Sequence, residues 1–417
     1  MILLLIDFGA SRIKSCLYDT DCENFLNIFS TPGASLTNID KVSLRTLNAS
    51  FNQHIQYHKN FNSIIICSEM HGFILCKDIK HLIDCEYISW RVNSKQNKDY
   101  ENRYEKSNYK KKTGITLRSG LPYCNLINHD LFGKDAHFLT LTDALILLNG
   151  EWMSKSPLHL AAATGMYDIF KKEWITELCG DNHRYYSSLH DFSKPLGYIT
   201  KVANEQIPIY GGLGDLQAAI FSIDIDKDII NLNLGTGSQI SMLYDKTDTQ
   251  YYDLRPLKNN SYISTITHIP CGRALQMYVN IFSSKKSQLE FWESLFRGDS
   301  TKIELTGKYP LGIFPGSYNY DSDFNILNLS ENAVKPSTLA IHLKRELFIQ
   351  YQEIIKKISA TRDVNKILIT GSLGNKIDNF SDTLQTFTGI ECNTSSNEYD
   401  STLIGLKNFY LEQNISL

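Results

Sequence analysis

Apolar runs broken by single polar residues and glycines recur along the chain and predict alternating strands and helices. The first run ends at Asp7, and Gly9 follows before a second β-rich run that ends at Asp19. This pattern predicts a β-hairpin whose turn exposes backbone N–H groups. Residues 228–245 align with residues 2–19 without a gap, with five identities in eighteen positions. The repeat predicts that the two halves of the chain are built alike.

The segments that follow each hairpin have a similar order. Residues 62–76 contain two apolar runs interrupted by a Met-His-Gly insertion, and 137–150 has helical spacing that ends at a glycine. In the second half, 337–359 predicts a long amphipathic helix with a serine N-cap, and 366–375 predicts a strand followed by a glycine turn. Strands and helices therefore alternate in both halves.

Length and composition fit a two-domain globular protein. A chain of 417 residues is too long for one ordinary core, and its 42% hydrophobic and 21% charged fractions are typical of soluble domains. We expect domains at 1–224 and 225–417, with the boundary in the acidic stretch just before the second hairpin. Two domains imply a cleft between them.

Charge and cysteine usage exclude several classes of protein. The net charge is −3, and the run Lys110-Lys111-Lys112, expected to be a solvated loop, is an isolated basic cluster, so no nucleic-acid partner is expected. Nine cysteines without a C-x-x-C pair favour reduced thiols in the cytoplasm over disulfides or zinc. The apolar start is interrupted at Asp7 and is too short for a signal-peptide core or a membrane span.

Both hairpin turns have a glycine at the same aligned position, Gly9 and Gly235. Glycine permits conformations and close approaches that a side chain would block, so such a turn can bring N–H groups up to a phosphate. One such turn is a weak signal because glycine is common in hairpins. Two copies predict a clamp that holds a polyphosphate from both sides.

Asp7 lies at the end of a buried strand, where an unpaired carboxylate is costly, so it needs a cation or a donor as a partner. Two interpretations remain open, a magnesium ion held through water and a carboxylate that accepts from nearby backbone donors. The aligned residue of the second hairpin is Asn233, so one copy is charged and the other neutral.

Asp215 follows three glycines and precedes an apolar helical stretch, which places it at or near a helix N-terminus. That position stabilises the ionised carboxylate, as a general base for a hydroxyl nucleophile requires. A helix-capping role is the alternative. His71, in a polar insertion between apolar runs, is either a donor to a sugar hydroxyl or a satisfied structural residue.

The order of these motifs resembles the FGGY family of carbohydrate kinases, within the group of sugar kinases, heat-shock proteins and actin-like ATPases. The resemblance extends from Ile2 to about Gly405. It is based on "DFGASRIK" (7–14), "EMHG" (69–72), "LGTGSQ" (234–239) and "ILITGSLGN" (367–375), and "GLGDLQAAIFS" (212–222) is most similar to sedoheptulose kinases. The implied fold is α/β with two actin-like (ribonuclease H-like) domains, each a mixed sheet flanked by helices, and the active site in the cleft between them.

The resemblance also implies roles for the matching residues. Asp215 would take the proton from a sugar hydroxyl that attacks the γ-phosphate of ATP, and Asp7 would organise Mg²⁺. Sugar contacts would come from Glu69, Met70, His71, Trp90 and Asp215. Nucleotide contacts would come from Gly9, Ser11, Lys14, Gly235, Thr236, Gly237, Gly371, Ser372 and Asn375.

Four residues depart from the family pattern. Glu69 replaces the usual Gln, and Val92 replaces an Asp that many relatives carry, which bears on the sugar recognised. Ala10 replaces a Thr and Ser372 replaces a Gly, which bears on nucleotide affinity.

We therefore expect an ATP-dependent kinase for a terminal hydroxyl of a ketose or polyol, with sedoheptulose as the first candidate. Domain closure would expel water and align the hydroxyl with the phosphate. Xylulose, another ketose and a modified heptose remain open as substrates. A non-catalytic sugar- or nucleotide-binding regulator is the alternative of another class, whereas an actin-like or chaperone-like ATPase is disfavoured by the sugar-site motif. The expected partner is a small-molecule sugar, and a homodimer is left open.

Overall fold

The structure is a computed structural model that describes most of the chain. The described residues are 1–9, 11–33, 41–90, 92, 106–118, 120–127, 129–180, 186–189, 191–200, 205–244, 252–258, 261–299, 309–314, 317–320, 332, 334–395 and 399–413. Ala10, which replaces the Thr of the family pattern, lies outside the described residues.

Contacts divide the chain into two compact units. Unit 1 comprises Met1–Asp224, Leu254–Ser261 and Glu398–Leu417, and unit 2 comprises Ile225–Asp253 and Tyr262–Asn397. Two segments that lie late in the sequence therefore pack with the N-terminal half. The assignment of a separate function to each domain stays a prediction.

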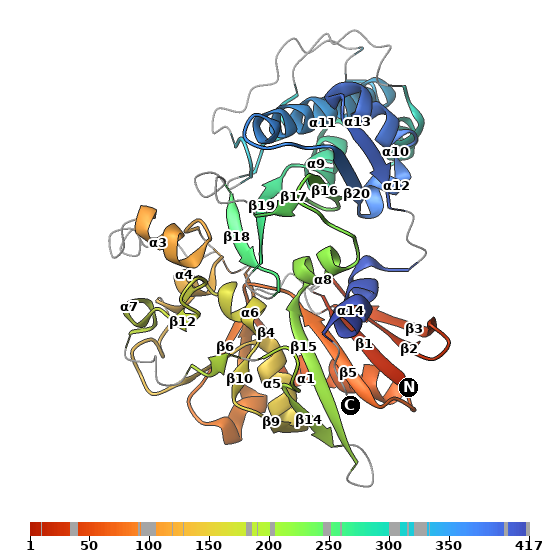
Figure 1. Ribbon diagram of the computed structural model, residues 1–417. Coiled ribbons are helices and arrows are strands. Elements are labelled where there is room, and N and C mark those ends of the chain that lie inside the picture. Colours follow the sequence, from red (N-terminus) through yellow and green to blue (C-terminus); the bar gives the residue numbers. More distant parts are fainter. Residues whose placement is uncertain are drawn as a thin grey trace. The chain divides into compact units, whose positions relative to one another are not determined.

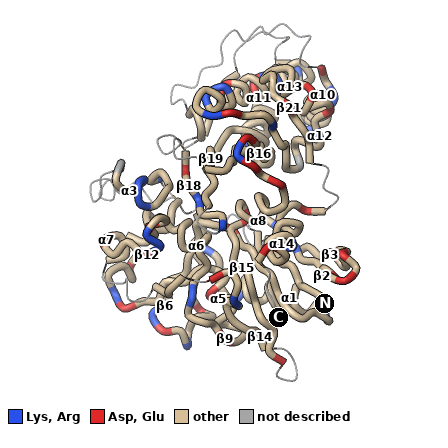
Figure 2. Tube along the Cα trace, viewed as in Figure 1, with Lys and Arg blue, Asp and Glu red and all other residues tan. Residues whose placement is uncertain are grey.

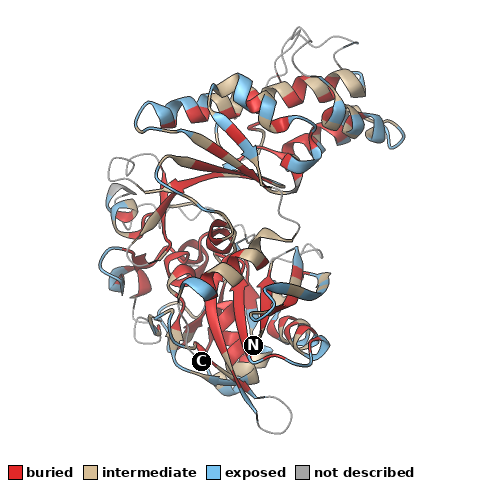
Figure 3. Ribbon diagram, turned by 45° about the vertical axis from the view of Figure 1, so that its right-hand side comes forward, coloured by how far each residue is buried: buried red, intermediate tan, exposed pale blue. Residues whose placement is uncertain are grey.

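Unit 1 is built on a mixed seven-stranded sheet. Its strand order is β3 (Asn24–Pro32), β2 (Arg12–Asp19), β1 (Ile2–Phe8), β5 (Ser63–Ser68), β15 (Gln206–Gly214), β14 (Gly197–Thr200) and β9 (Gly150–Trp152). β5 pairs in parallel with both β1 and β15. These central strands are buried, as Figure 3 shows, because both of their faces are covered. That double burial explains why they appear in the sequence as continuous apolar runs.

Smaller sheets and helices complete unit 1 (Figure 1). A four-stranded sheet has the order β4 (Lys41–Ser43), β7 (Glu86–Ile88), β6 (Phe73–Cys76) and β8 (His137–Leu139), and β10 (Lys155–Ser156) pairs with β13 (Ser188–Leu189) and β11 (Tyr167–Asp168) with β12 (Glu173–Trp174). The helices are α1 (Leu44–Tyr57), η2 (Ile79–Asp84), α3 (Lys106–Thr113), α4 (Pro122–Leu126), α5 (Leu141–Asn149), α6 (Leu158–Ala162), α7 (Thr176–Cys179), α8 (Asp215–Phe221) and α14 (Ser401–Glu412).

Two local predictions in unit 1 are corrected, and the structure confirms that the apolar runs of 62–76 are strands. The stretch 137–150 is helical only from Leu141. Thr140 is the N-cap and forms a capping box with Asp143, and residues 137–139 before it belong to β8. The lysine run 110–112 lies on helix α3 instead of a loop, where it is visible in Figure 2. The apolar runs of 62–76 are β5 and β6, which belong to different sheets, so the Met-His-Gly insertion marks the point where the chain leaves one sheet for another.

Unit 2 has its own mixed sheet. The strands follow the order β19 (Tyr262–Ile269), β17 (Ser238–Leu243), β16 (Ile229–Leu234), β20 (Lys366–Thr370) and β21 (Glu391–Thr394), and β18 (Asp253–Pro256) spans the boundary between the units. The helices are α9 (Gly272–Phe282), α10 (Gln288–Arg297), α11 (Pro336–Ser359), α12 (Ser372–Lys376) and α13 (Phe380–Thr388). The predicted serine N-cap of the long helix is wrong. α11 starts one residue earlier, with Pro336 in its first turn and Lys335 as the N-cap, because proline suits that position.

The two aligned hairpins both form, but they pair in different registers. Asp7 lies opposite Lys14 across β1 and β2, whereas Asn233 lies opposite Gln239 across β16 and β17. The residue aligned with Lys14 is Ile240, so the second register is displaced by one residue. The first hairpin therefore joins two opposite charges, and the second joins two amides.

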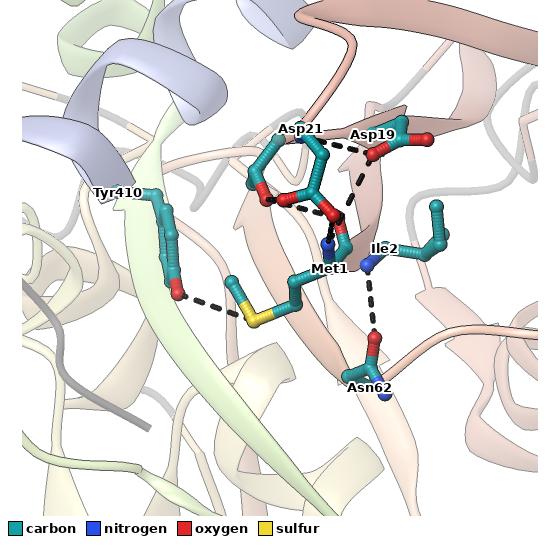
Figure 4. A network of polar contacts seen from close by, with 7 residues as sticks. Met1, Ile2, Asp19, Asp21, Asn62 and Tyr410 are labelled. Atoms are coloured by element: carbon teal, nitrogen blue, oxygen red, sulfur yellow. Dashed lines mark hydrogen bonds and ion pairs between the residues drawn. The ribbon is translucent and has the colours of Figure 1, made fainter.

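The start of β1 is held by a polar network, shown in Figure 4. The N-terminal ammonium of Met1 lies 2.9 Å from Asp21 Oδ2, and the Ile2 N–H donates to Asn62 Oδ1 at 2.8 Å. The Tyr410 hydroxyl of α14 contacts the Met1 sulfur at 3.8 Å. These contacts fix the start of β1, the strand that carries Asp7 close to its carboxyl end.

Among the described residues, no helix combines the length and the apolar character needed to cross a membrane.

Candidate functional site

Asp7 lies in a polar cluster at the carboxyl end of β1. Thr402 Oγ1 donates to Asp7 Oδ2 at 2.7 Å, and the Cys67 thiol lies 3.5 Å from the other carboxylate oxygen. The ammonium of Lys14 is 3.8 Å from Asp7 and 2.6 Å from Asp400 Oδ2. The cluster therefore combines the first hairpin with the beginning of α14.

Burial and neighbouring charges together set the pKa values of this cluster. Burial raises the pKa of the Asp7 carboxyl, and the Asp400 charge raises it further, against the lowering effect of Lys14. Burial lowers the pKa of the Lys14 ammonium, but the charges of Asp7 and Asp400 outweigh it, and the net shift is upward. Burial raises the pKa of Asp400, while Lys14 lowers it, and the net shift is downward. Lys14 is therefore a stable cation between two carboxylates.

Asp215 is the first residue of α8, as the sequence predicted, and Gly214 is its N-cap. Its Oδ1 accepts from the Leu216 N–H at 2.9 Å. The Leu216 N–H at the helix start lowers the pKa of Asp215, as the sequence predicted, but it does not decide the net shift. Burial raises the pKa of the Asp215 carboxyl to about 6, and the charge of Asp7 adds to this rise, because the helix N-terminus does not offset the lost hydration. The carboxylate is therefore ionised at neutral pH, and its pKa is close enough to neutrality for it to accept a proton readily.

Two of the residues predicted to contact a sugar, Glu69 and Met70, lie near Asp215 in unit 1. A Cβ on Gly214 would lie 2.5 Å from the Met70 sulfur, so the buried Met70 packs at the junction of β15 and α8. Glu69 is buried, and its charge raises the pKa of Asp215. Trp90 is 41% exposed, and its backbone carbonyl lies 2.5 Å from the position of a Cβ on Gly120. Whether these residues contact a sugar stays a prediction.

Both ring nitrogens of His71 have partners in the protein. Nδ1 lies 2.6 Å from the Ala163 carbonyl oxygen, and Nε2 lies 3.3 Å from Nη2 of Arg255. These contacts are the ones expected if His71 is a satisfied structural residue, one of the two interpretations that the sequence left open. His71 also has a positive φ of 64°, which is uncommon for a side chain of its size.

Arg255 comes from a segment that the sequence placed in the other domain. Pro256 O accepts from the Gln217 side chain of α8 at 3.2 Å, and Leu257 O accepts from His159 Nε2 of α6 at 2.7 Å. The Leu254 N–H donates to Gly114 O at 2.6 Å. The backbone on both sides of Arg255 is thus fixed to unit 1.

In unit 2, two of the predicted nucleotide motifs lie together. Gly371 has φ +89°, and a Cβ there would be 2.3 Å from Leu234 O and 2.7 Å from the Asn233 side-chain oxygen. Only glycine permits this close approach of the β20 turn to the β16–β17 hairpin. Thr236 and Gly237 are exposed, as is Asn375 on α12, whereas the side chain of Ser372 is not described.

The turn of the second hairpin is held by the N-terminus of α9. The Gly272 N–H donates to Gly235 O at 3.2 Å, and the Arg273 N–H donates to Thr236 O at 2.7 Å. The carbonyls of the turn are therefore engaged within unit 2. In the first hairpin, Gly9 is constrained more tightly than Gly235, because a Cβ on Gly9 would lie 2.7 Å from Arg12 O, whereas a Cβ on Gly235 would lie 3.5 Å from Gly237 O. Ser11 is exposed, and its carbonyl accepts from the Gly33 N–H at 2.9 Å.

Helices α8 and α14 cross at very close range. A Cβ on Gly405 would lie 1.6 Å from Ala218 O, and Asn408 Nδ2 donates to Phe221 O at 2.8 Å. This contact fixes the helix that begins with Asp215 against the helix that begins next to Asp400. The positions of the two carboxylates are therefore coupled through helix packing.

Sequence reasoning missed Asp400, Thr402 and Arg255. Asp400 accepts from the Thr402 N–H at 3.1 Å as the N-cap of α14, and this Asp-x-Thr pattern before an apolar helix was a detectable signal for a helix start. Nothing in the sequence pattern placed it beside Lys14. The sequence around Arg255 contains no comparable signal.

Comparison with known proteins establishes the fold. No protein-family model and no curated protein sequence matches this chain. The ligand-bound xylulose kinase from Lactobacillus acidophilus matches with a TM-score of 0.81 at 14% identity, over 100% of this chain and 90% of that chain. The gluconate kinase from the same organism gives 0.79 at 15% identity, over 100% and 90%. The glycerol kinase from Plasmodium falciparum with ADP gives 0.76 at 16% identity, over 100% and 90%. The expected α/β fold, with mixed sheets flanked by helices, is confirmed, and this chain has the fold of these carbohydrate kinases.

Proposed function

We propose that this protein is an ATP-dependent kinase that phosphorylates a hydroxyl of a sugar. The observation that supports this most strongly is the state of Asp215, a carboxylate at the start of α8 whose pKa is raised to about 6. A general base works best when its pKa lies near the working pH. Perturbed carboxylates of this kind are concentrated at functional sites.

In the proposed reaction, Asp215 accepts the proton of the sugar hydroxyl as the hydroxyl oxygen attacks the γ-phosphorus of ATP. The bond from that phosphorus to the β–γ bridging oxygen breaks, and ADP leaves. In phosphoryl transfer the protein mainly positions the groups and stabilises charge. Glu69 and Asp215 would accept hydrogen bonds from sugar hydroxyls, while Met70 and Trp90 would provide apolar contact surface.

ATP contacts are proposed at Gly9, Ser11 and Lys14 of the first hairpin. In unit 2 they are proposed at Gly235, Thr236, Gly237, Gly371, Ser372 and Asn375. Gly371 packs closely on the β16–β17 hairpin, so the two glycine-containing turns of unit 2 lie side by side. Their proximity supports the proposed ATP contacts in unit 2. In the first hairpin, Lys14 lies opposite Asp7, two residues before Gly9, in the register of β1 and β2.

The residues around Asp7 fit a magnesium ion. Mg²⁺ is usually held by one or two carboxylates together with waters and substrate phosphates, and Asp7 and Asp400 are carboxylates of one cluster. Among the described residues no group of three or more His, Cys, Asp or Glu side chains could hold a metal ion, so the site depends on phosphate and water ligands. When bound, the ion would neutralise charge on the β- and γ-phosphates.

The acceptor is proposed to be a neutral ketose, with sedoheptulose as the first candidate. Glu69 and Asp215 bring two carboxylates to the pocket and Arg255 brings one guanidinium, so a sugar acid such as gluconate is less favoured. Xylulose and glycerol, the substrates named for two of the fold relatives, are the next candidates.

A coupled assay for ADP release tests this proposal over five-, six- and seven-carbon ketoses, polyols and gluconate. We expect the highest kcat/KM for a neutral ketose, with a requirement for Mg²⁺. Nucleotide binding without phosphoryl transfer to any acceptor would contradict the kinase and support the non-catalytic regulator.

A further inference from the structure

Arg255 is a buried cation that the proposed reaction does not require as acid, base or phosphate ligand. It is 4% exposed. A buried charge is costly unless it has hydrogen-bond acceptors or charges of opposite sign close by. Its charge acts on Asp215, as does the opposite charge of Glu69. Arg255 therefore belongs electrostatically to the acidic pocket around the base.

The hydrogen bonds of His71 determine which ring nitrogen carries the proton. The carbonyl of Ala163 can only accept, so Nδ1 at 2.6 Å must carry hydrogen and donate. The guanidinium of Arg255 can only donate, so Nε2 at 3.3 Å must be unprotonated and accept. With both partners in place, His71 is a neutral ring in a single tautomer.

The backbone at His71 and Gly72 is confined on both sides. His71 adopts φ +64°, which places it in the left-handed region. A Cβ on the next residue, Gly72, would lie 1.8 Å from the Tyr87 hydroxyl, so the chain is also confined on that side. The contacts of the two ring nitrogens with Ala163 and Arg255 hold the His71 ring in one orientation at this turn.

We propose that Arg255 is a positioning residue of the sugar pocket, and that it acts by holding His71 in one ring orientation and in the Nδ1–H tautomer. Arg255 can do so because its neighbours Leu254, Pro256 and Leu257 are hydrogen-bonded to three different parts of unit 1. The segment 254–257 thereby fixes the orientation of His71, which belongs to the motif 69–72. This inference rests on the proposed function for its kinetic consequence, but not for the state of the ring.

The state of the ring is tested by long-range 1H–15N NMR at neutral pH. The variant His71→Gln identifies the His71 signals by their loss. We expect a protonated Nδ1 and an unprotonated Nε2 in the wild type. In Arg255→Met, where the donor that keeps Nε2 unprotonated is gone, we expect hydrogen on Nε2 in part of the population, and in Arg255→Lys, which keeps a donor, we expect the wild-type state to return. Arg362→Met is the matched control, since it removes an arginine that donates to Leu243 O at 2.8 Å in unit 2, and it should leave His71 unchanged.

The kinetic consequence is tested in the coupled assay with the best acceptor. We expect Arg255→Met to raise KM for the sugar by about tenfold to a hundredfold, as the loss of one hydrogen bond to a charged group predicts, with a smaller change in kcat and none in KM for ATP. Arg255→Lys should recover most of the loss. If Arg255 only stabilised the fold, Arg255→Met would lower the amount of folded enzyme and would not raise KM for the sugar selectively over KM for ATP.

The possible outcomes separate this inference from the proposed function. A wild-type His71 with hydrogen on Nε2, or a tautomer that is unchanged in Arg255→Met, overturns the inference. A raised sugar KM without a tautomer change also overturns it, since Arg255 would then act on the sugar directly. If the wild type phosphorylates no acceptor, the proposed function fails and the NMR result still decides the role of Arg255. If Arg255→Met does not fold by circular dichroism, the wild-type spectrum and Arg255→Lys decide.

Discussion

The Lys14 ammonium and the Asp400 carboxylate lie 2.6 Å apart, although the two residues are 386 positions apart in the sequence. The pair connects the second strand of the first hairpin to the N-cap of α14. Thr402, two residues further on, donates to Asp7 and so completes the connection between this helix and the end of β1. The first hairpin is therefore held by α14, the last helix of the described residues.

Replacing Lys14 by Met should destabilise the protein, because it leaves Asp7 and Asp400 as neighbouring like charges. At pH 7 we expect a loss of about 1.5–3 kcal/mol in the free energy of unfolding, the range for hydrogen bonds to charged groups. The loss should shrink as the pH falls and the carboxylates protonate, starting with Asp7, whose pKa is raised. Urea unfolding at several pH values measures this, and Lys14→Met/Asp400→Asn should be more stable than Lys14→Met alone. An equal deficit at every pH would contradict the electrostatic cause.

Asp215→Asn should remove the proposed base while preserving shape. We expect kcat to fall by about 10²- to 10⁴-fold, the usual contribution of a positioned general base, with unchanged nucleotide binding by calorimetry. Asp226→Asn, at an exposed acid shortly after α8, is the control and should keep wild-type turnover. Wild-type turnover in Asp215→Asn would exclude this residue as the base.

The pH dependence of kcat/KM should report the carboxyl of Asp215. Its pKa is raised to about 6 in the folded protein, so the base is protonated and inactive below that pH and ionised above it. We expect kcat/KM to rise with pH through about 6 and to level off near neutrality. The measurement is a pH profile of the coupled assay at saturating ATP, with stability checked at each pH. A profile that stays flat down to pH 5 would argue against a carboxylate base with this pKa.

Gly405→Ala should disturb the crossing of α8 and α14. The added methyl group would collide with the Ala218 carbonyl, 1.6 Å from the ideal Cβ position, so the helices must separate. We expect a loss of about 1–3 kcal/mol in the free energy of unfolding, the range for an overpacked core, despite the better helix propensity of alanine. Thermal unfolding measures the loss, with Lys407→Ala on the same helix as the control. Because α8 begins at Asp215, kcat should fall more than the loss of folded protein explains.

Local pattern predicted those parts of the fold whose geometry is set by nearby residues. The two hairpins, the strands of 62–76 and the start of α8 at Asp215 follow from apolar spacing and glycine turns. Pattern failed where a competing local interaction set the boundary, as with the capping box of Thr140 or the proline at the start of α11. The pairing register of the second hairpin was also not apparent, since strands of similar pattern can pair one residue apart.

By itself, the sequence determined the α/β class, the doubled hairpin and the positions of Asp7 and Asp215 at the ends of structural elements. Only the tertiary structure decided that Asp400 and Thr402 would meet Asp7, that Arg255 would meet His71, and that burial would raise the pKa of Asp215. The physical reason is the range of the interactions. Turns and helix starts depend on backbone preferences over a few residues, whereas ion pairs and desolvation depend on which distant segments the core brings together.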